Sequence, residues 1–308
     1  MVAQRSGPRP EIALVVNPNA GRLTDQTRKE VVGELRRRFR VDAYFTTARD
    51  TGITTASELA DSGAQVVVAF GGDGHVNEVA NGLAGTKSVL GIIPGGTMNV
   101  FARALEIPLD PIKAIDILED HFDHEPRIVP LGKANDRYFT FSAGCGFDAE
   151  AAERVERYVP SKRRLGELFF YWSAFRVLTG SLRSRAPWMT IKGDFGEQMV
   201  AMAVACNAGP YAYLFGRAVN LAPEVTLEEG IDLFALKSMR IEALPLYVWR
   251  VAVSGNLIGH PDVFYKSNLG DFEVTSNQPF SHHVDGEPLP PARRVRFTVE
   301  KNILRVRV

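Results

Sequence analysis

Three glycine-containing turns could bind phosphate. They are Asn17 to Gly21 (NPNAG), Gly71 to Gly74 (GGDG) and Pro94 to Thr97 (PGGT), and each follows a β-branched segment and precedes a helical pattern. Glycine permits positive φ and a close approach of the backbone, and amides at a helix N-terminus attract anions. One such turn is as well explained by steric needs, but three at one edge of a sheet can surround a polyphosphate. Neither GxxxxGK(S/T) nor GxGxxG occurs, which argues against a P-loop or an ordinary dinucleotide site.

Acidic residues in two turns could handle protons or metal ions. Asp73 opens the helical pattern after GGDG, where it could contact Mg²⁺ or simply cap the helix, because Asp is a favoured N-cap residue. Asn77, Glu78 and Asn81 follow in the first turns of that helix. Glu287 ends an Asp-Gly-Glu triplet between strand-like segments. Asp-Gly predicts a tight hairpin, and such a turn can also present Glu287 as a proton acceptor.

Two further polar clusters have simple explanations. His282 and His283 could suggest a metal pair, but adjacent side chains on a strand face opposite ways, so we assign them no role. Glu228, Glu229 and Gly230 are most simply a solvated acidic turn.

Strands and helices that alternate through residue 120 must position these turns. Strands are predicted at 11–16, 41–46, 65–70 and 88–94, with helical patterns between them. In the first helical pattern, Thr27 and Glu30 have the spacing of a capping box. Buried strands that alternate with helices predict a parallel α/β sheet, whose ligands lie beyond the carboxyl ends of the strands.

The pattern changes at about residue 128. Short alternating segments then predict an antiparallel sheet or sandwich, interrupted by one helical insertion at 165–179. The predicted fold class is α/β, with an N-terminal parallel α/β nucleotide-binding domain at 1–128 and a β-rich, sandwich-like domain at 129–308. The last strand could return to the first domain. A length of 308 residues agrees with two domains of roughly 150 residues each.

Composition limits the class of protein. Lys plus Arg is 36 and Asp plus Glu is 36, so a net charge of zero argues against a strongly basic nucleic-acid-binding protein or an acidic tail, although local charge could still matter. Cys145 and Cys206 have neither metal nor disulfide spacing and indicate a reducing cytoplasm. No segment reaches the ~18 uninterrupted apolar residues of a membrane span, so we expect a soluble protein or one that touches a membrane surface.

Five segments resemble motifs of one family of lipid kinases. GGDGHVNEVANGL at 71–83 resembles the GGDGTxNEVxNG signature of the soluble diacylglycerol kinase and sphingosine kinase-like lipid kinases. NPNAG and PGGTMNVFAR are similar to that family's NPxxG and PxGTxNDFA motifs, HVDGE to its DGE motif, and PEVTLEEG to its PxAxxDDG segment. The resemblance covers most of the chain. It implies a nucleotide-binding α/β domain joined to a β-rich domain, with ATP in the cleft.

The resemblance also implies roles in ATP- and Mg²⁺-dependent phosphoryl transfer. Glu287 would be the general base, and Asp73 would hold Mg²⁺ or orient the acceptor hydroxyl. A structural Mg²⁺ would be bound by the carboxylate of Glu229 with backbone carbonyls of Thr226 and Ile231. The residues that would contact ATP are Asn17, Pro18, Asn19, Ala20, Gly21, Thr47, Gly71, Gly72, Asp73, Gly74, His75, Val76, Asn77 and Thr97.

Three positions depart from the family pattern. His75 stands where the family usually has Thr, which removes a hydroxyl that could reach a phosphate. Val100 stands where many relatives have an Asp that could help to hold catalytic Mg²⁺, and Glu229 replaces another Asp. These departures leave a catalytically weak nucleotide- or lipid-binding pseudokinase as an alternative.

A basic, aromatic segment suggests how a lipid could be reached. Residues 157–185 contain seven basic residues and one acidic residue, a formal charge of +6 with His neutral. The Leu-Phe-Phe-Tyr-Trp run inside this segment could enter the headgroup region of an anionic bilayer. Alternatively, the helix is buried against the β-rich domain and lines a pocket for an acyl chain.

The sequence therefore predicts an ATP- and Mg²⁺-dependent lipid kinase that phosphorylates diacylglycerol or a related lipid in phospholipid biosynthesis. The expected partners are a lipid substrate and a peripheral membrane surface, not nucleic acid. The sequence leaves open whether the protein forms a homodimer. The expected location is the cytoplasm, with transient contact at the inner face of the membrane. An NAD-kinase-like enzyme with a soluble substrate, which would share GGDG, is the enzymatic alternative.

Overall fold

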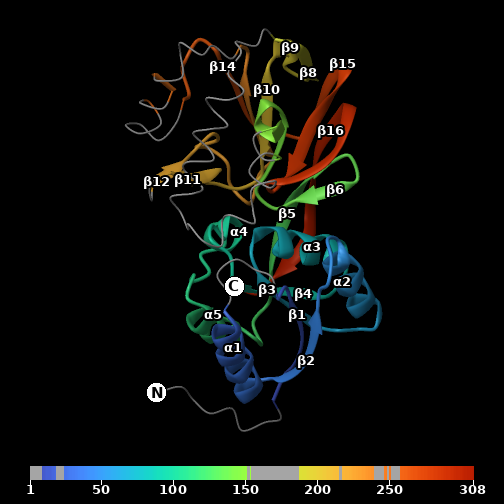
Figure 1. Ribbon diagram of the computed structural model, residues 1–308, viewed down its shortest axis with the longest axis vertical. Helices are drawn as coiled ribbons and strands as arrows, with labels where there is room; N and C mark the ends of the chain where they lie inside the picture. The colour runs from blue at the N-terminus through green and yellow to red at the C-terminus, as the bar shows by residue number, and fades with distance from the viewer. Residues whose placement is uncertain are drawn as a thin grey trace. The chain divides into compact units, whose positions relative to one another are not determined.

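The computed structural model describes residues 9–18, 24–150, 153, 187–214, 217–238, 246–247, 250 and 257–308. Contacts divide the chain into two compact units (Figure 1). Unit 1 is Met1–Val129 with Asn302–Val308, and unit 2 is Pro130–Lys301. The predicted helix at 165–179 and the basic segment at 157–185 lie outside the described residues. Among the helices that are described, none is long and apolar enough to cross a membrane.

Unit 1 is built on a parallel sheet. Its strands run in the order β4-β3-β1-β2 and are β1 (Glu11–Val16), β2 (Arg40–Phe45), β3 (Val66–Gly71) and β4 (Val89–Pro94). The end of β16 (Glu287–Val306) also pairs with β4 in parallel. β1, β3 and β4 are almost wholly buried, as expected of strands covered by helices on both faces. The predicted parallel α/β fold is confirmed.

Helices cover both faces of this sheet. α1 (Asp25–Arg38) packs with α5 (Pro111–Asp120), and α2 (Thr51–Asp61) packs with α3 (Asp73–Leu83) (Figure 1). A short helix, α4 (Val100–Ala104), follows the PGGT turn. The strand order explains the arrangement, because right-handed crossovers from β1 to β2 and from β2 back to β3 lie on opposite faces of the sheet.

α1 begins one turn before its predicted capping box. Thr24, not Thr27, is the N-cap, and its hydroxyl accepts from Thr27 N at 3.0 Å. Glu30 accepts from Gln26 Nε2 at 2.7 Å instead of closing the box. Asp25 then lies in the first turn, where a negative charge suits the helix dipole. Thr24 offers the same capping chemistry three residues earlier, which explains the difference.

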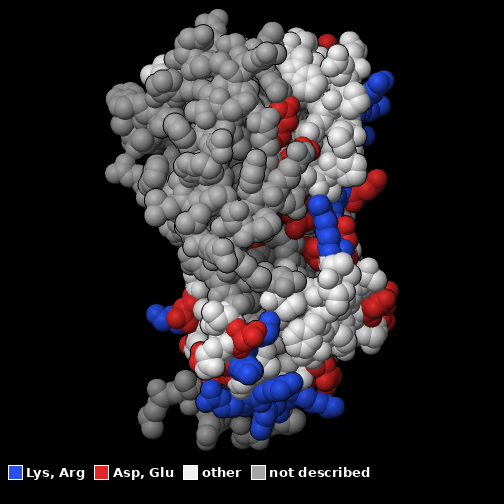
Figure 2. All heavy atoms as spheres, viewed as in Figure 1, with Lys and Arg blue, Asp and Glu red and all other residues white. Residues whose placement is uncertain are grey.

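Basic side chains gather near the end of α1 (Figure 2). Arg36 and Arg37 are exposed. Arg38 instead bonds Asp116 Oδ1 at 2.6 Å and Glu119 Oε2 at 2.9 Å, both on α5. Part of the acidic charge of α5 is therefore offset within unit 1.

Unit 2 is rich in antiparallel strands. Its main strands run in the order β14-β13-β10-β7-β15-β16, and neighbours in this order are antiparallel. They are β7 (Ser142–Gly146), β10 (Met202–Cys206), β13 (Ile231–Leu236), β14 (Val263–Leu269), β15 (Asp271–Val284) and β16. The other strands are β5 (Arg127–Ala134), β6 (Arg137–Phe139), β8 (Met189–Gly193), β9 (Gly196–Val200), β11 (Ala212–Leu214) and β12 (Arg217–Val219). The predicted β-rich second half is confirmed.

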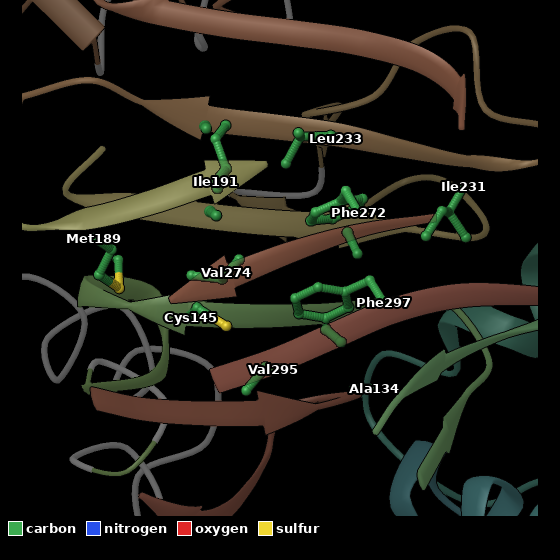
Figure 3. Close-up of a cluster of buried hydrophobic side chains, with 14 of the residues drawn as sticks. Ala134, Cys145, Met189, Ile191, Ile231, Leu233, Phe272, Val274, Val295 and Phe297 are labelled. Atoms are coloured by element: carbon green, nitrogen blue, oxygen red, sulfur yellow. The ribbon is translucent and has the colours of Figure 1, made fainter. Parts of the chain in front are cut away.

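The central strands β7, β10 and β13 of unit 2 are buried on both faces. One hydrophobic cluster includes Cys145, Phe272 and Phe297 (Figure 3). Alternate residues of β10 face this cluster or a second one, which contains Cys206. Both cysteines are free, and burial raises the pKa of each thiol. Side chains on both faces of the strands thus hold unit 2 together.

Candidate functional site

Asn17 and the glycine turns at 71–74 and 94–97 lie together at the carboxyl edge of the parallel sheet. Backbone hydrogen bonds connect them, because Asn17 N donates to Phe70 O at 3.1 Å and Gly95 N donates to Gly71 O at 2.7 Å. The ends of β1, β3 and β4 are therefore held against one another. A site for several phosphate groups needs backbone amides fixed in this way.

The GGDG and PGGT turns touch at two glycines. A Cβ added to Gly96 would lie 2.6 Å from the Cα of Gly72, so this approach requires glycine. Asn99 closes the second turn, since its Oδ1 accepts from Gly96 N and its Nδ2 donates to Gly96 O, each at 2.9 Å. Its φ of 49° lies in the left-handed region, which Asn enters more readily than most residues. Asn99 was not among the predicted site residues, although an Asn just after a glycine turn is a recognisable signal.

Exposure separates the residues predicted to contact ATP. Thr47 and Thr97 are exposed. The half-buried residues are Asn17, Pro18, Gly72, Asp73 and Gly74. The buried residues are Gly71, His75, Val76 and Asn77. Asn19, Ala20 and Gly21 lie outside the described residues. A nucleotide could therefore meet the two threonine side chains directly, whereas the buried residues could offer little beyond their backbone.

Asp73 connects the GGDG turn to the helix after PGGT. Its Oδ1 accepts from the backbone N of Val100, the first residue of α4, at 2.6 Å. The alternative that Asp73 caps its own helix is wrong, because Gly72 is the N-cap of α3 and Asp73 is the first residue of that helix. Val100 lacks a carboxylate, but its backbone amide holds the Asp73 side chain in place.

Glu78 caps a helix other than its own. Its Oε1 accepts from Asp50 N and its Oε2 accepts from Gly52 N, each at 2.9 Å. These amides at the start of α2 need an outside partner, because Asp50 makes no side-chain capping bond. Glu78 is buried and fixes α2 against α3, shortly after Thr47. This polar residue of α3 therefore positions a neighbouring element of the site.

His75 points inward, toward the end of β1. Its Nε2 donates to Val15 O at 3.0 Å, and the ring is buried. Burial lowers the pKa of His75, so the neutral ring is favoured. The imidazole is therefore not placed to contact a phosphate as a threonine hydroxyl at the surface of the GGDG turn could. Its hydrogen bond instead connects α3 to β1.

Acidification is expected to destabilise the protein in part through His75. The unfolded chain takes up a proton near the ordinary imidazole pKa of 6.5, whereas the folded protein resists it. Stability present above that pH is therefore lost as the pH falls. His75→Gln, which can still donate to Val15 O but does not titrate, should flatten this dependence. Urea unfolding of both proteins from about pH 7.5 to about pH 5.5 measures it, and equal slopes would contradict the assignment.

Asp285 and Gly286 form the tip of the β15–β16 hairpin. Their φ angles are 47° and 79°, and Val284 pairs with Glu287 across the turn. Asp-Gly favours such a two-residue turn, so the predicted hairpin is confirmed. The Glu287 side chain is 25% exposed, and its Oε2 lies 3.8 Å from Nη2 of Arg137 on β6. The turn thus presents a partly exposed carboxylate beside a cation.

The carboxylate of Asp285 anchors this turn. Its Oδ2 accepts from the backbone N and the Oγ1 of Thr140, each at 2.7 Å. Its Oδ1 accepts from Phe141 N and Ser142 N, each at 3.0 Å. Burial raises the pKa of the Asp285 carboxyl despite these four donors. The segment between β6 and β7 therefore holds the turn that carries Glu287.

The predicted structural metal site lies in an acidic turn of unit 2. Thr226 and Glu229 are exposed, and Ile231 is buried at the start of β13. Burial raises the pKa of nearby Asp232, and the charges of Glu224 and Glu229 add to this effect. In the part of the chain that the structure describes, no three His, Cys, Asp or Glu side chains are grouped to hold a metal ion. A cation here would depend on Glu229 and backbone carbonyls.

Known proteins resemble this chain along most of its length. The family model of the diacylglycerol kinase catalytic domain matches residues 11–125, which include the three glycine turns. The diacylglycerol kinase of Bacillus subtilis (strain 168) is 31% identical over 287 residues, which cover 89% of this chain and 88% of that protein. A crystal structure of a diacylglycerol kinase from Bacillus anthracis str. Sterne matches with a TM-score of 0.73 and 21% identity over 96% of both chains.

A second solved structure has a more distant likeness. The crystal structure of an NAD kinase from Archaeoglobus fulgidus in complex with ATP matches with a TM-score of 0.51 and 11% identity, over 96% of this chain and 93% of that chain. At such identities, both structural likenesses concern the fold alone.

Proposed function

Because the chain belongs to the diacylglycerol kinase family and is a lipid kinase, we propose that it transfers the γ-phosphate of ATP to a hydroxyl group of diacylglycerol or a related lipid. The observation that carries this proposal is the joined carboxyl edge of unit 1, where two glycine turns touch at Gly72 and Gly96. Phosphoryl transfer asks a protein mainly to position phosphate oxygens and to neutralise their charge. Amides in fixed turns can do this without reorganising.

ATP would be bound by backbone and hydroxyl groups along this edge. The proposed contacts are the backbone of Asn17 to Gly21 and of Gly71 to Asn77, together with the exposed side chains of Thr47 and Thr97. The Thr47 contact would depend on Glu78, which holds the start of α2 just after it.

Asp73 would hold the catalytic Mg²⁺ or orient the acceptor hydroxyl. A half-buried carboxylate beside a phosphate-binding turn fits Mg²⁺, which prefers oxygen ligands. Bound Mg²⁺ would neutralise charge on the phosphates. The bond from Val100 N to Asp73 Oδ1 supports this role, because it fixes the carboxylate without adding a second one.

Asp73→Asn is expected to lower kcat by about 10²-fold or more while leaving the melting temperature nearly unchanged. The amide oxygen can still accept from Val100 N, but it brings no negative charge to a metal ion. Asp73→Ala should lower both kcat and the melting temperature, because it also removes the hydrogen bond to α4, which contributes about 1 kcal/mol to stability. Kinetics and thermal unfolding of the two variants at saturating Mg²⁺ separate these effects. Wild-type kcat in Asp73→Asn would rule out a role for the charge.

Glu287 would be the general base that accepts the proton of the lipid hydroxyl. The hairpin supports this role, since it presents the carboxylate partly exposed and 3.8 Å from Arg137. Glu229, with carbonyls of Thr226 and Ile231, would bind a structural Mg²⁺. That cation would offset the charges of Glu224 and Glu229, which add to the effect of burial in raising the pKa of Asp232.

A lipid acceptor requires contact with a membrane. We propose a cytoplasmic enzyme that binds the inner face of the membrane transiently. The segment at 157–185, with its formal charge of +6, is the predicted contact. It stays a prediction, because it lies outside the described residues.

A panel of acceptors tests the proposed function. The purified protein is incubated with labelled ATP, Mg²⁺ and micelles that contain diacylglycerol, monoacylglycerol or a sphingoid base, and separately with NAD without detergent. We expect transfer to a lipid, dependent on ATP and Mg²⁺ and lost in Glu287→Gln. Transfer to NAD alone would overturn the lipid assignment. Thermal stabilisation by ATP without transfer to any acceptor would overturn catalysis in favour of nucleotide binding.

A further inference from the structure

A buried histidine contacts the backbone of the turn that carries Glu287. His283 lies on β15 just before this turn, and its Nδ1 accepts from Gly286 N at 3.2 Å. Its Nε2 lies 2.6 Å from Oδ2 of Asp148. The exposed fractions of the His283 and Asp148 side chains are 2% and 10%. His283 is thus too deeply buried to touch a substrate.

The hydrogen bonds define which nitrogen of His283 carries the proton. A backbone N–H can only donate, so Nδ1 accepts from Gly286. The proton of the neutral ring is therefore on Nε2, which donates to Asp148. Asp148 is held in turn by the hydroxyl of Tyr211, which donates to its Oδ1. Tyr211, Asp148 and His283 thus form one chain of contacts that ends at the turn.

Because Gly144 has no side chain, Asp148 and His283 have room to contact each other. Gly144 lies opposite His283 where β7 pairs with β15. A Cβ at Gly144 would overlap the Asp148 carboxylate and would lie 2.6 Å from His283 Nε2. Well-packed apolar side chains are often at least as stabilising as a buried polar pair. Packing alone therefore does not explain these residues.

We propose that His283 is a positioning residue for Glu287, a role that rests on the proposed lipid kinase function. Gly286 directly precedes Glu287, and in a two-residue hairpin turn its amide is not used by the strand ladder. His283 binds this amide, whereas Asp285 fixes the other half of the turn. The Asp285–Gly286 peptide, which includes this amide, cannot rotate without breaking the bond to His283. The carboxylate therefore keeps its direction toward the acceptor hydroxyl.

Variants of the histidine test this role. His283→Leu is expected to lower kcat for lipid phosphorylation about 30- to 100-fold with KM for ATP unchanged, since a misplaced catalytic group can cost ~10²-fold. His283→Gln can accept from Gly286 and donate to Asp148, so it should recover most of this loss. Asp148→Asn should also lower kcat, because an amide that donates to Nε2 would move the ring proton to Nδ1, against Gly286 N.

Val274→Ala is the matched control for lost stability. Val274 is a fully buried residue of the same strand and belongs to the cluster of Figure 3. Its truncation should lower the melting temperature while kcat stays within about twofold of wild type. Hydrogen exchange of residues 283–288 adds a readout that does not depend on catalysis. Gly286 N should exchange faster in His283→Leu and at the wild-type rate in Val274→Ala.

The outcomes separate this role from the proposed function. These outcomes are read once the wild-type enzyme phosphorylates lipid and Glu287→Gln does not. The positioning role is then wrong if His283→Leu loses no more kcat than Val274→Ala. It is also wrong if hydrogen exchange at Gly286 N is unchanged in His283→Leu. If the wild-type protein phosphorylates no lipid, the proposed function fails, and a catalytic positioning role for His283 fails with it.

Discussion

Replacing Glu287 with glutamine is expected to lower kcat for lipid phosphorylation by about 10²- to 10⁴-fold, the usual contribution of general acid–base catalysis. Glutamine has nearly the same size and can stay beside Arg137, but it cannot accept a proton from the lipid hydroxyl. The hairpin should survive the change, because Asp285 and Gly286 define its geometry. The measurement is the initial rate on diacylglycerol micelles, with the melting temperature and ATP affinity recorded for the same sample.

Glu300→Gln is the control for losing a carboxylate from β16. Glu300 accepts from Lys133 Nζ at 2.8 Å and from Tyr138 Oη at 2.6 Å, and both of these partners lie outside the turn. Its replacement should leave kcat within about twofold of wild type, because a partly exposed pair contributes little to stability and this one lies outside the turn. If Glu287→Gln keeps more than about a tenth of wild-type kcat, general-base catalysis by Glu287 is too small to be its main role. Asp73 would then be the next candidate for the base.

Replacing Asp285 with asparagine is expected to lower the free energy of unfolding by about 2–5 kcal/mol, although the side chains have almost the same shape. Each carboxylate oxygen accepts two hydrogen bonds. Oδ2 accepts both from Thr140, and Oδ1 accepts one each from Phe141 and Ser142. An amide has one oxygen, so its NH₂ group would face two donors. Buried donors that lose their acceptor are costly, and urea unfolding measures the loss.

Asp271→Asn is the matched control at the other end of β15. Its Oδ2 accepts from Arg296 Nη2 at 2.9 Å, and the exposed fractions of the Asp271 and Arg296 side chains are 56% and 61%. An exposed pair contributes about 0–1 kcal/mol, so this variant should be close to wild type. A loss below about 1 kcal/mol for Asp285→Asn would show that the four bonds do not anchor the turn.

Much of unit 1 could be predicted because its signals are local. The strand predicted at 11–16 begins and ends at those residues, and the strand predicted at 65–70 is displaced by one residue. Each is mainly a run of buried apolar residues, and β1 ends before Asn-Pro and β3 within Gly-Gly, which are pairs that favour turns. The Asp285-Gly286 hairpin was predictable for the same reason, since two adjacent residues with positive φ define the turn.

The roles of the polar side chains were harder to predict. Glu78 was noted as a polar residue of α3, but its carboxylate accepts from amides that lie 26 and 28 positions earlier in the chain. The partner of Asp73 is 27 positions away, and that of His75 is 60 positions away. A pattern within one helix cannot show which distant amide will lie opposite a side chain.

The sequence by itself determined the alternation of strands and helices in unit 1, the β-rich second half, the tight hairpin and the resemblance to a lipid kinase family. Only the tertiary structure decided that Asp73 holds α4, that Glu78 caps α2, and that His283, to which the sequence assigned no role, binds the amide before Glu287. The physical reason is the range of the forces involved. Hydrophobic periodicity and turn preferences act over a few neighbouring residues, whereas a buried hydrogen bond forms only after packing has brought its donor and acceptor together.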